Sequence, residues 1–419
     1  MGSVKAFANT GPTHMMAKTG AAGSSPTKTI EIDWDNEEHR RCIIACLVEG
    51  TYVLESERAK SSEADDDDDS DNDSDKPLAP AWWESFGFRL FRELKCACGC
   101  ALCKIRRHII EAKRPRFICG AIFEYAPPEG SPRHPSAPSY VAICGSLKMV
   151  LNTHHNCGRF SHARQEVGKF LYSTGSCAAV WLAGHSLGAS IALDVGRAII
   201  MGANREVNML PTTFLFNPPQ VSLSPAAVIS IISDKLHMGE AVKNGLHTVS
   251  NILKHGLGEV LRTHKNNMDE QFEQLSPWVP NLYVHQRDII CKGFIDYFEQ
   301  RERIKEKLPH VAASGAELSF RDMFRSVLGG QKQCSVGCSS QQSSAAVGQK
   351  LNASSNSTND YRQHHYRQDL LPSATLWKNE SPDGNAHALR QWWQPQGPEL
   401  VLSHKSYKWS APLNEDGLI

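Results

Sequence analysis

The chain has 419 residues, of which 41% are hydrophobic, and its 45 basic and 45 acidic side chains leave a formal net charge of zero. This length is enough for a large buried core, and the balanced charge gives no general attraction to nucleic acid or anionic membranes. No apolar run is long enough to cross a bilayer, and the N-terminus lacks the apolar stretch of a secretory signal. Thirteen cysteines without framework spacing are typical of a reducing compartment, so we expect a soluble, cytoplasmic protein.

Composition divides the chain into ordered parts and insertions. Residues 1–28 are small, polar and aperiodic, which predicts a disordered tail. An Asp-rich run predicts an acidic insertion at 58–76, and a cysteine cluster predicts a second insertion at 95–116. Residues 332–360 are rich in Ser, Gln and Asn and predict a flexible linker. Residues 29–419 are therefore expected to form a single domain that carries these insertions.

The remaining segments alternate between helical and extended patterns. In chain order they predict helices at 37–54 and 82–94, strands at 117–125 and 140–144, a helix at 161–172, a strand at 178–183, a helix at 189–197, a strand at 213–216, helices over 226–262, a strand at 282–285 and a helix at 294–307. Strands that alternate with helices indicate an α/β fold with a mostly parallel central sheet and helices on both faces.

The pentapeptide Gly184-His185-Ser186-Leu187-Gly188 lies between the strand at 178–183 and the helix at 189–197. A strand, a tight turn with the pattern G-x-S-x-G and a helix are the context of a nucleophile elbow. Glycines are needed two positions from the serine because a Cβ atom there would collide with neighbouring backbone. The helix N-terminus adds N–H donors and a favourable dipole for a developing oxyanion. The alternative is a glycine-rich turn without chemistry.

A serine hydroxyl becomes a nucleophile when an imidazole takes its proton and a carboxylate fixes the imidazole tautomer. In α/β-hydrolases the carboxylate and then the histidine follow the serine along the chain. Asp288 suits the carboxylate role because it follows the strand at 282–285 and precedes the apolar Ile289-Ile290. Its alternative role is an ordinary loop aspartate that caps the next helix.

The histidine is harder to choose among the 18 in the chain. His185 adjoins the serine and is expected to be structural, and His285 lies inside a strand. His387 lies in a late loop ahead of Trp392, and His404 follows it. Position alone does not decide between His387 and His404.

The motif from Trp181 to Ala189 resembles the class 3 (fungal-type) lipases. Much of the rest is similar to a plant branch of lipase-like α/β-hydrolases that is often labelled GDSL esterase/lipase, although no GDSL motif occurs here. The further matching segments are 39–41, 79–84, 123–125, 214–219, 278–284, 371–374, 386–387 and 391–393. The resemblance implies an α/β-hydrolase fold with Ser186 as nucleophile, Asp288 as acid and His387 as base, and with no metal or organic cofactor.

The resemblance also locates the oxyanion hole. One donor would be the backbone N–H of Leu187. The second would belong to Ser146 in Cys144-Gly145-Ser146, where the family usually has Arg-Gly-Thr or Arg-Gly-Ser. Only twelve residues separate Ser146 from Arg159, so the longer charged segment of the family is missing. Two functions therefore follow from the sequence: a serine carboxylester hydrolase, or a lipase-like protein that has lost its chemistry and serves interaction or signalling.

The insertion at 95–116 contains a cluster of four cysteines, Cys96, Cys98, Cys100 and Cys103. Four thiols could bind zinc or an iron–sulfur centre, but structural zinc sites usually separate two cysteine pairs widely. A cysteine-rich surface loop is the interpretation that the spacing favours.

The expected partner of the protein is an acyl ester or lipid substrate. We expect transient contact with a membrane surface and no binding of nucleic acid.

Overall fold

The computed structural model describes residues 14–15, 32–61, 82–95, 117–127, 130, 132–145, 158–174, 179–202, 210–220, 270–307, 371–382, 385–398 and 400–409. All of them belong to one compact unit formed by Met1–Leu318 and Leu371–Ile419. The helices predicted over 226–262, the linker at 332–360 and the cysteine cluster from Cys96 to Cys103 lie outside the described residues. So do most of the tail at 1–28 and most of the acidic insertion at 58–76.

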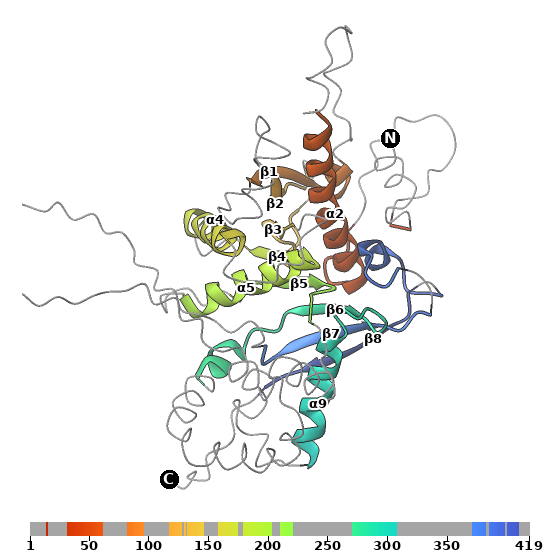
Figure 1. Ribbon diagram of the computed structural model, residues 1–419. Helices are drawn as coiled ribbons and strands as arrows, with labels where there is room; N and C mark the ends of the chain where they lie inside the picture. Colours follow the sequence, from red (N-terminus) through yellow and green to blue (C-terminus); the bar gives the residue numbers. More distant parts are fainter. Residues whose placement is uncertain are drawn as a thin grey trace, which may run out of the picture. The chain divides into compact units, whose positions relative to one another are not determined.

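One mixed sheet of eight strands organises the described chain, and its strands follow one another in sequence order (Figure 1). The strands are β1 (Phe88–Lys95), β2 (Ile118–Tyr125), β3 (Tyr140–Cys144), β4 (Val180–His185), β5 (Thr213–Phe216), β6 (Asn281–His285), β7 (Ala374–Asn379) and β8 (Leu402–Tyr407). The five strands from β3 to β7 are mutually parallel, whereas β1, β2 and β8 pair antiparallel at the two edges. The predicted α/β fold with a mostly parallel sheet is confirmed.

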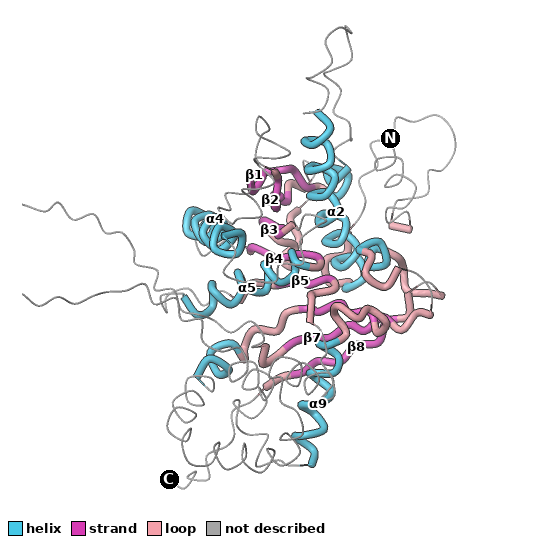
Figure 2. The backbone as a smooth tube through the Cα atoms, in the orientation of Figure 1, coloured by secondary structure: helices cyan, strands magenta, loops and turns pink. Residues whose placement is uncertain are grey.

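Helices cover both faces of this sheet (Figure 2). The elements are α2 (Glu37–Ser61), the 3-10 helix η2 (Trp82–Phe86), α4 (Gly158–Thr174), α5 (Leu187–Gly202), α9 (Gly293–Lys307) and the 3-10 helix η4 (Leu389–Trp393). On β4, Trp181 and Ala183 belong to the core cluster that includes the apolar side of α2 and η4. Because successive strand residues point to opposite faces, Leu182 points to the other face, where α5 packs on β3, β4 and β5.

The prediction of a helix over residues 82–94 is wrong. The segment begins as η2, turns at Gly87 with a φ of 74°, and continues as β1. Two register shifts in β1 interrupt its pairing with β2, one between Leu90 and Arg92 and one between Leu94 and Lys95. At these irregularities the two-residue alternation of a strand is interrupted, and apolar residues lie three and four positions apart. This spacing is the one that predicts a helix from sequence.

No helix among the described residues combines the length and apolarity that a bilayer span requires. No group of three or more His, Cys, Asp or Glu side chains in the same part of the chain could hold a metal ion. The cysteines described there, Cys42, Cys46, Cys119, Cys144 and Cys291, are free thiols.

Close packing at one helix glycine leads to a stability prediction. In α5, a Cβ atom on Gly196 would lie 2.5 Å from the buried ring of Trp278, whereas a Cβ atom on Gly168 of α4 meets no atom within 4 Å. We expect Gly196→Ala to lower the free energy of unfolding by about 1–3 kcal/mol through overpacking. Gly168→Ala should raise it by roughly 0.5–1 kcal/mol because alanine favours the helix.

Urea unfolding of the two variants beside the wild type measures both effects. Opposite shifts of the two midpoints are expected. A Gly196→Ala variant as stable as Gly168→Ala would show that the Trp278 ring yields without cost, contrary to the packing described here.

Candidate active site

Ser186 occupies a backbone turn that its neighbours tightly constrain. It directly follows β4, has a φ of 54°, and its N–H donates to Phe216 O on β5 (2.9 Å). A positive φ is costly for a residue with a side chain, so the surrounding structure must impose it. A Cβ atom on Gly184 would lie 2.4 Å from Gly188 backbone atoms, and one on Gly188 would lie 2.1 Å from Cys144 O. The expected steric role of both glycines is confirmed.

The helix that follows the serine begins at Leu187, one of the two expected oxyanion donors. Leu187 is the first residue of α5, so its N–H is among the four at a helix start that have no intrahelical partner. The N–H of Gly145 is already used, because it donates to Cys119 O at 2.8 Å. Ser146, the expected second oxyanion donor, lies outside the described residues, as does the shortened segment that follows it.

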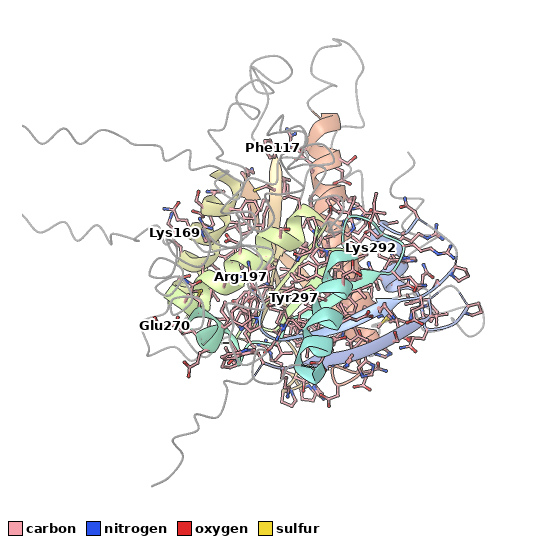
Figure 3. The ribbon with its side chains drawn as sticks, turned by 60° about the horizontal axis from the view of Figure 1, so that its bottom comes forward. Phe117, Lys169, Arg197, Glu270, Lys292 and Tyr297 are labelled. Atoms are coloured by element: carbon pink, nitrogen blue, oxygen red, sulfur yellow. The ribbon has the colours of Figure 1, made fainter. Side chains whose placement is uncertain are left out.

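Asp288 lies in a tight loop after β6 and is almost fully buried, with 4% of its surface exposed. Its Oδ1 accepts the N–H of Ile290 at 3.0 Å. Its Oδ2 accepts from Asn217 Nδ2 at 2.8 Å and from the Cys291 thiol at 3.0 Å. The loop also runs directly into α9: Lys292, labelled in Figure 3, donates its N–H to Asp288 O at 2.8 Å.

The hydrogen bonds of Asp288 determine its charge. Burial by itself raises the pKa of this carboxyl, but hydrogen bonds from His387, Cys291 and the Ile290 N–H outweigh burial and hold the pKa at about 2. Burial, together with the neighbouring Asp288 carboxylate to which the thiol donates, raises the pKa of Cys291. Asp288 is therefore ionised at neutral pH and Cys291 is a neutral thiol.

His387 joins Ser186 and Asp288. Its Nδ1 lies 2.7 Å from Asp288 Oδ2 and its Nε2 lies 2.9 Å from Ser186 Oγ. An ionised carboxylate can only accept, so Nδ1 carries the ring proton and Nε2 accepts from the serine hydroxyl. The other candidate, His404, lies on β8 and stacks on Trp377 with ring centroids 4.5 Å apart. The structure thus brings together Ser186, Asp288 and His387, and does not include His404.

His185 is a buried support for the His387 loop. Its Nε2 lies 2.9 Å from His387 O, and its Nδ1 lies 3.1 Å from the hydroxyl of Tyr52 on α2. A carbonyl can only accept, so Nε2 carries the proton and Nδ1 accepts from Tyr52. Burial lowers the pKa of His185 to about 4, which keeps the ring neutral at physiological pH. The ring contacts fit the structural role that we expected.

Asn217 is a site residue that the sequence did not indicate. It directly follows β5 with a φ of 46° and is fully buried. Its Nδ2 donates to Asp288 Oδ2 and to Ala386 O, at 2.8 and 3.0 Å, and its Oδ1 accepts from Trp392 Nε1. The signal that was present is the Phe-Asn-Pro-Pro stretch at 216–219, since asparagine is enriched at positive φ.

Gln391 of η4 also holds the loop that carries His387. Its side-chain Nε2 donates to Ala386 O at 2.9 Å and to Ala388 O at 2.8 Å. Its Oε1 accepts from Asn379 Nδ2, at the end of β7, at 2.7 Å. On the other side of η4, the buried Arg41 of α2 donates to Trp392 O. The His387 loop is therefore held from the sheet and from α2.

The pKa of His185 predicts an acid dependence of stability. An unfolded histidine has a pKa of about 6.5, so between pH 6.5 and 4 the unfolded chain binds a proton that the folded chain does not. Stability should therefore fall as the pH drops through this window, with no contribution from His185 above it. The full effect is on the order of 3 kcal/mol. His185→Gln should lose less stability than the wild type over the same range, as measured by urea unfolding at each pH.

His404→Gln, at an exposed position of β8, is the control. Because other groups titrate in the same window, the informative quantity is the difference in slope between each variant and the wild type. Equal slopes for His185→Gln and the wild type would contradict a neutral, buried His185.

The chain is similar to a protein of Arabidopsis thaliana named GDSL esterase/lipase At4g10955. The two are 28% identical over 408 residues, which cover 88% of this chain and 93% of that protein. No protein-family model matches the chain. No solved structure matches it either. The similarity to the Arabidopsis protein therefore extends over nearly the full length of both chains and is not confined to the pentapeptide around Ser186.

Proposed function

We propose that this protein is a serine carboxylester hydrolase that cleaves acyl esters through an acyl-enzyme on Ser186. The observation that supports this most is the continuous set of hydrogen bonds from Ser186 Oγ through the His387 ring to the Asp288 carboxylate. The serine also stands at a constrained turn before the N-terminus of α5, where N–H groups can stabilise an oxyanion. The name of the Arabidopsis relative supports the same reaction class.

In the first half-reaction, Ser186 Oγ attacks the acyl carbon of the ester while His387 Nε2 takes the hydroxyl proton. Asp288 keeps the other ring nitrogen protonated and stabilises the positive charge that develops on the ring. The negative charge on the tetrahedral oxygen is stabilised by the Leu187 N–H and, in this proposal, by that of Ser146. His387 then gives its proton to the departing alcohol, which leaves the acyl group on Ser186.

In the second half-reaction, His387 takes a proton from water, which attacks the acyl-enzyme carbonyl. Collapse of the second tetrahedral intermediate releases the carboxylic acid, and the proton on His387 returns to Ser186 Oγ. We further propose, from the resemblance to class 3 lipases, that the acyl group is apolar and lipid-like. The alternative function is a lipase-like protein without chemistry. The sequence observation behind it is the short segment after Ser146, which lies outside the described residues, and nothing in the described structure favours it.

Labelling with a fluorophosphonate probe tests the nucleophile. The wild type should react and should hydrolyse a p-nitrophenyl acyl ester, because the His387 ring accepts the Ser186 proton. Ser186→Ala should lose labelling and at least about 10³-fold in kcat. Ser190→Ala, one turn along α5, is the matched control and should keep both activities. Undiminished turnover by Ser186→Ala would disprove the assignment.

Paired histidine variants test the base. His387→Ala should lower kcat by at least about 10³-fold because Ser186 then has no proton acceptor. His404→Ala removes a ring that stacks on Trp377 at the sheet edge and should leave kcat within about threefold of the wild type. The reverse pattern in the ester assay would transfer the base role to His404.

A further inference from the structure

We infer that Asn217 is a positioning residue that couples the proposed acid to the loop of the proposed base, an inference that rests on the proposed function. Its Nδ2 carries two hydrogens and donates to both Asp288 Oδ2 and Ala386 O, at 2.8 and 3.0 Å. Asp288 accepts the His387 ring proton on the same oxygen, and Ala386 is the residue immediately before His387. The Asn217 amide thus bonds both to the loop of Asp288 and to the loop of His387, next to the hydrogen bond that joins these two residues.

Asparagine is the residue type that meets all the demands of this position. The φ of 46° favours asparagine, aspartate or glycine. Of these, aspartate has no hydrogens to donate at neutral pH, and glycine has no side chain. Asn217 Oδ1 is used as well, because it accepts from Trp392 Nε1, which is fully buried. Every polar group of the side chain is therefore paired, and its orientation is fixed by donors and acceptors on three sides.

The other groups around Asp288 and His387 each act on one of the two loops. Cys291 and the Ile290 N–H bond to Asp288 from within its own loop. Gln391 bonds to carbonyls on both sides of His387 but is anchored on β7 through Asn379. Asn217 is attached to a different strand, because its own N–H donates to Tyr283 O on β6. It therefore fixes the Asp288 to His387 spacing from the sheet itself.

This arrangement predicts an effect on the chemical step and not on substrate binding. A displacement of about 1 Å in a reacting group can cost on the order of 10²-fold in rate. Among the described residues, the hydrogen bonds of Asn217 reach neither Ser186 nor Leu187. Its loss should therefore change kcat while KM stays within about threefold.

Two variants with a matched control test the inference in the p-nitrophenyl ester assay. Asn217→Gly keeps the backbone conformation and removes the amide, and kcat should fall by about 10- to 100-fold. Asn217→Asp keeps the size but places a second carboxylate 2.8 Å from Asp288, so kcat should fall further, by 10²-fold or more.

Asn281→Asp is the control for an amide that pairs with a tryptophan, at a half-buried position. Asn281 Oδ1 accepts from Trp377 Nε1 at 3.2 Å, but Asn281 begins β6 at the end of the sheet away from Ser186. Its variant should keep kcat within about threefold of the wild type. Wild-type kcat in both folded Asn217 variants would overturn the inference.

A second readout does not depend on activity. The proton that His387 Nδ1 donates to Asp288 should give a far-downfield proton resonance in NMR spectra. We expect this resonance to shift or disappear in both Asn217 variants and to persist in Asn281→Asp, and an unchanged resonance in the Asn217 variants would overturn the inference. If the wild type neither labels at Ser186 nor hydrolyses esters, the proposed function fails, while the resonance still decides the role of Asn217.

Discussion

The arrangement of the candidate site depends on one buried negative charge, the Asp288 carboxylate. A carboxylate that is 4% exposed stays ionised only when donors replace the water it has lost. Those donors come from three places in the fold: its own loop, Asn217 after β5, and His387 after β7. The charge therefore constrains three loops at once, and a displacement of any of them leaves it partly unpaired.

The parallel strands explain why residues so distant in sequence can meet this demand. Ser186 follows β4, Asn217 follows β5, Asp288 lies in the loop after β6, and His387 lies beyond β7. Because these four strands are parallel and adjacent, their carboxyl ends lie along one edge of the sheet. The strand order thus lines up the nucleophile candidate, the amide, the carboxylate and the histidine side by side.

Local constraints were predictable from the sequence and long-range ones were not. The Ser186 turn could be predicted because its steric requirement, the absence of a Cβ atom at Gly184 and Gly188, appears within five residues of sequence. The choice of His387 over His404 needed the resemblance, since only the fold separates a loop at the site from a strand at the sheet edge. Asn217 escaped notice because its partners Asp288 and Ala386 are 71 and 169 residues away. The wrong prediction at β1 has a local cause instead. The strand is irregular, with two register shifts, and its apolar spacing is typical of a helix.

The loop that carries His387 shows how a segment without regular secondary structure can hold a ring in place. Its consecutive carbonyls Ala386 O, His387 O and Ala388 O all accept from buried or half-buried side chains. The donors are Asn217, His185 and Gln391, which belong to different elements, so no single local motion releases the loop. Freezing a loop costs about 1–2 kcal/mol per residue in backbone entropy. Because this entropy is lost when the protein folds, the His387 ring already lies within reach of Ser186 before any substrate binds. The ring therefore does not have to be oriented during the reaction.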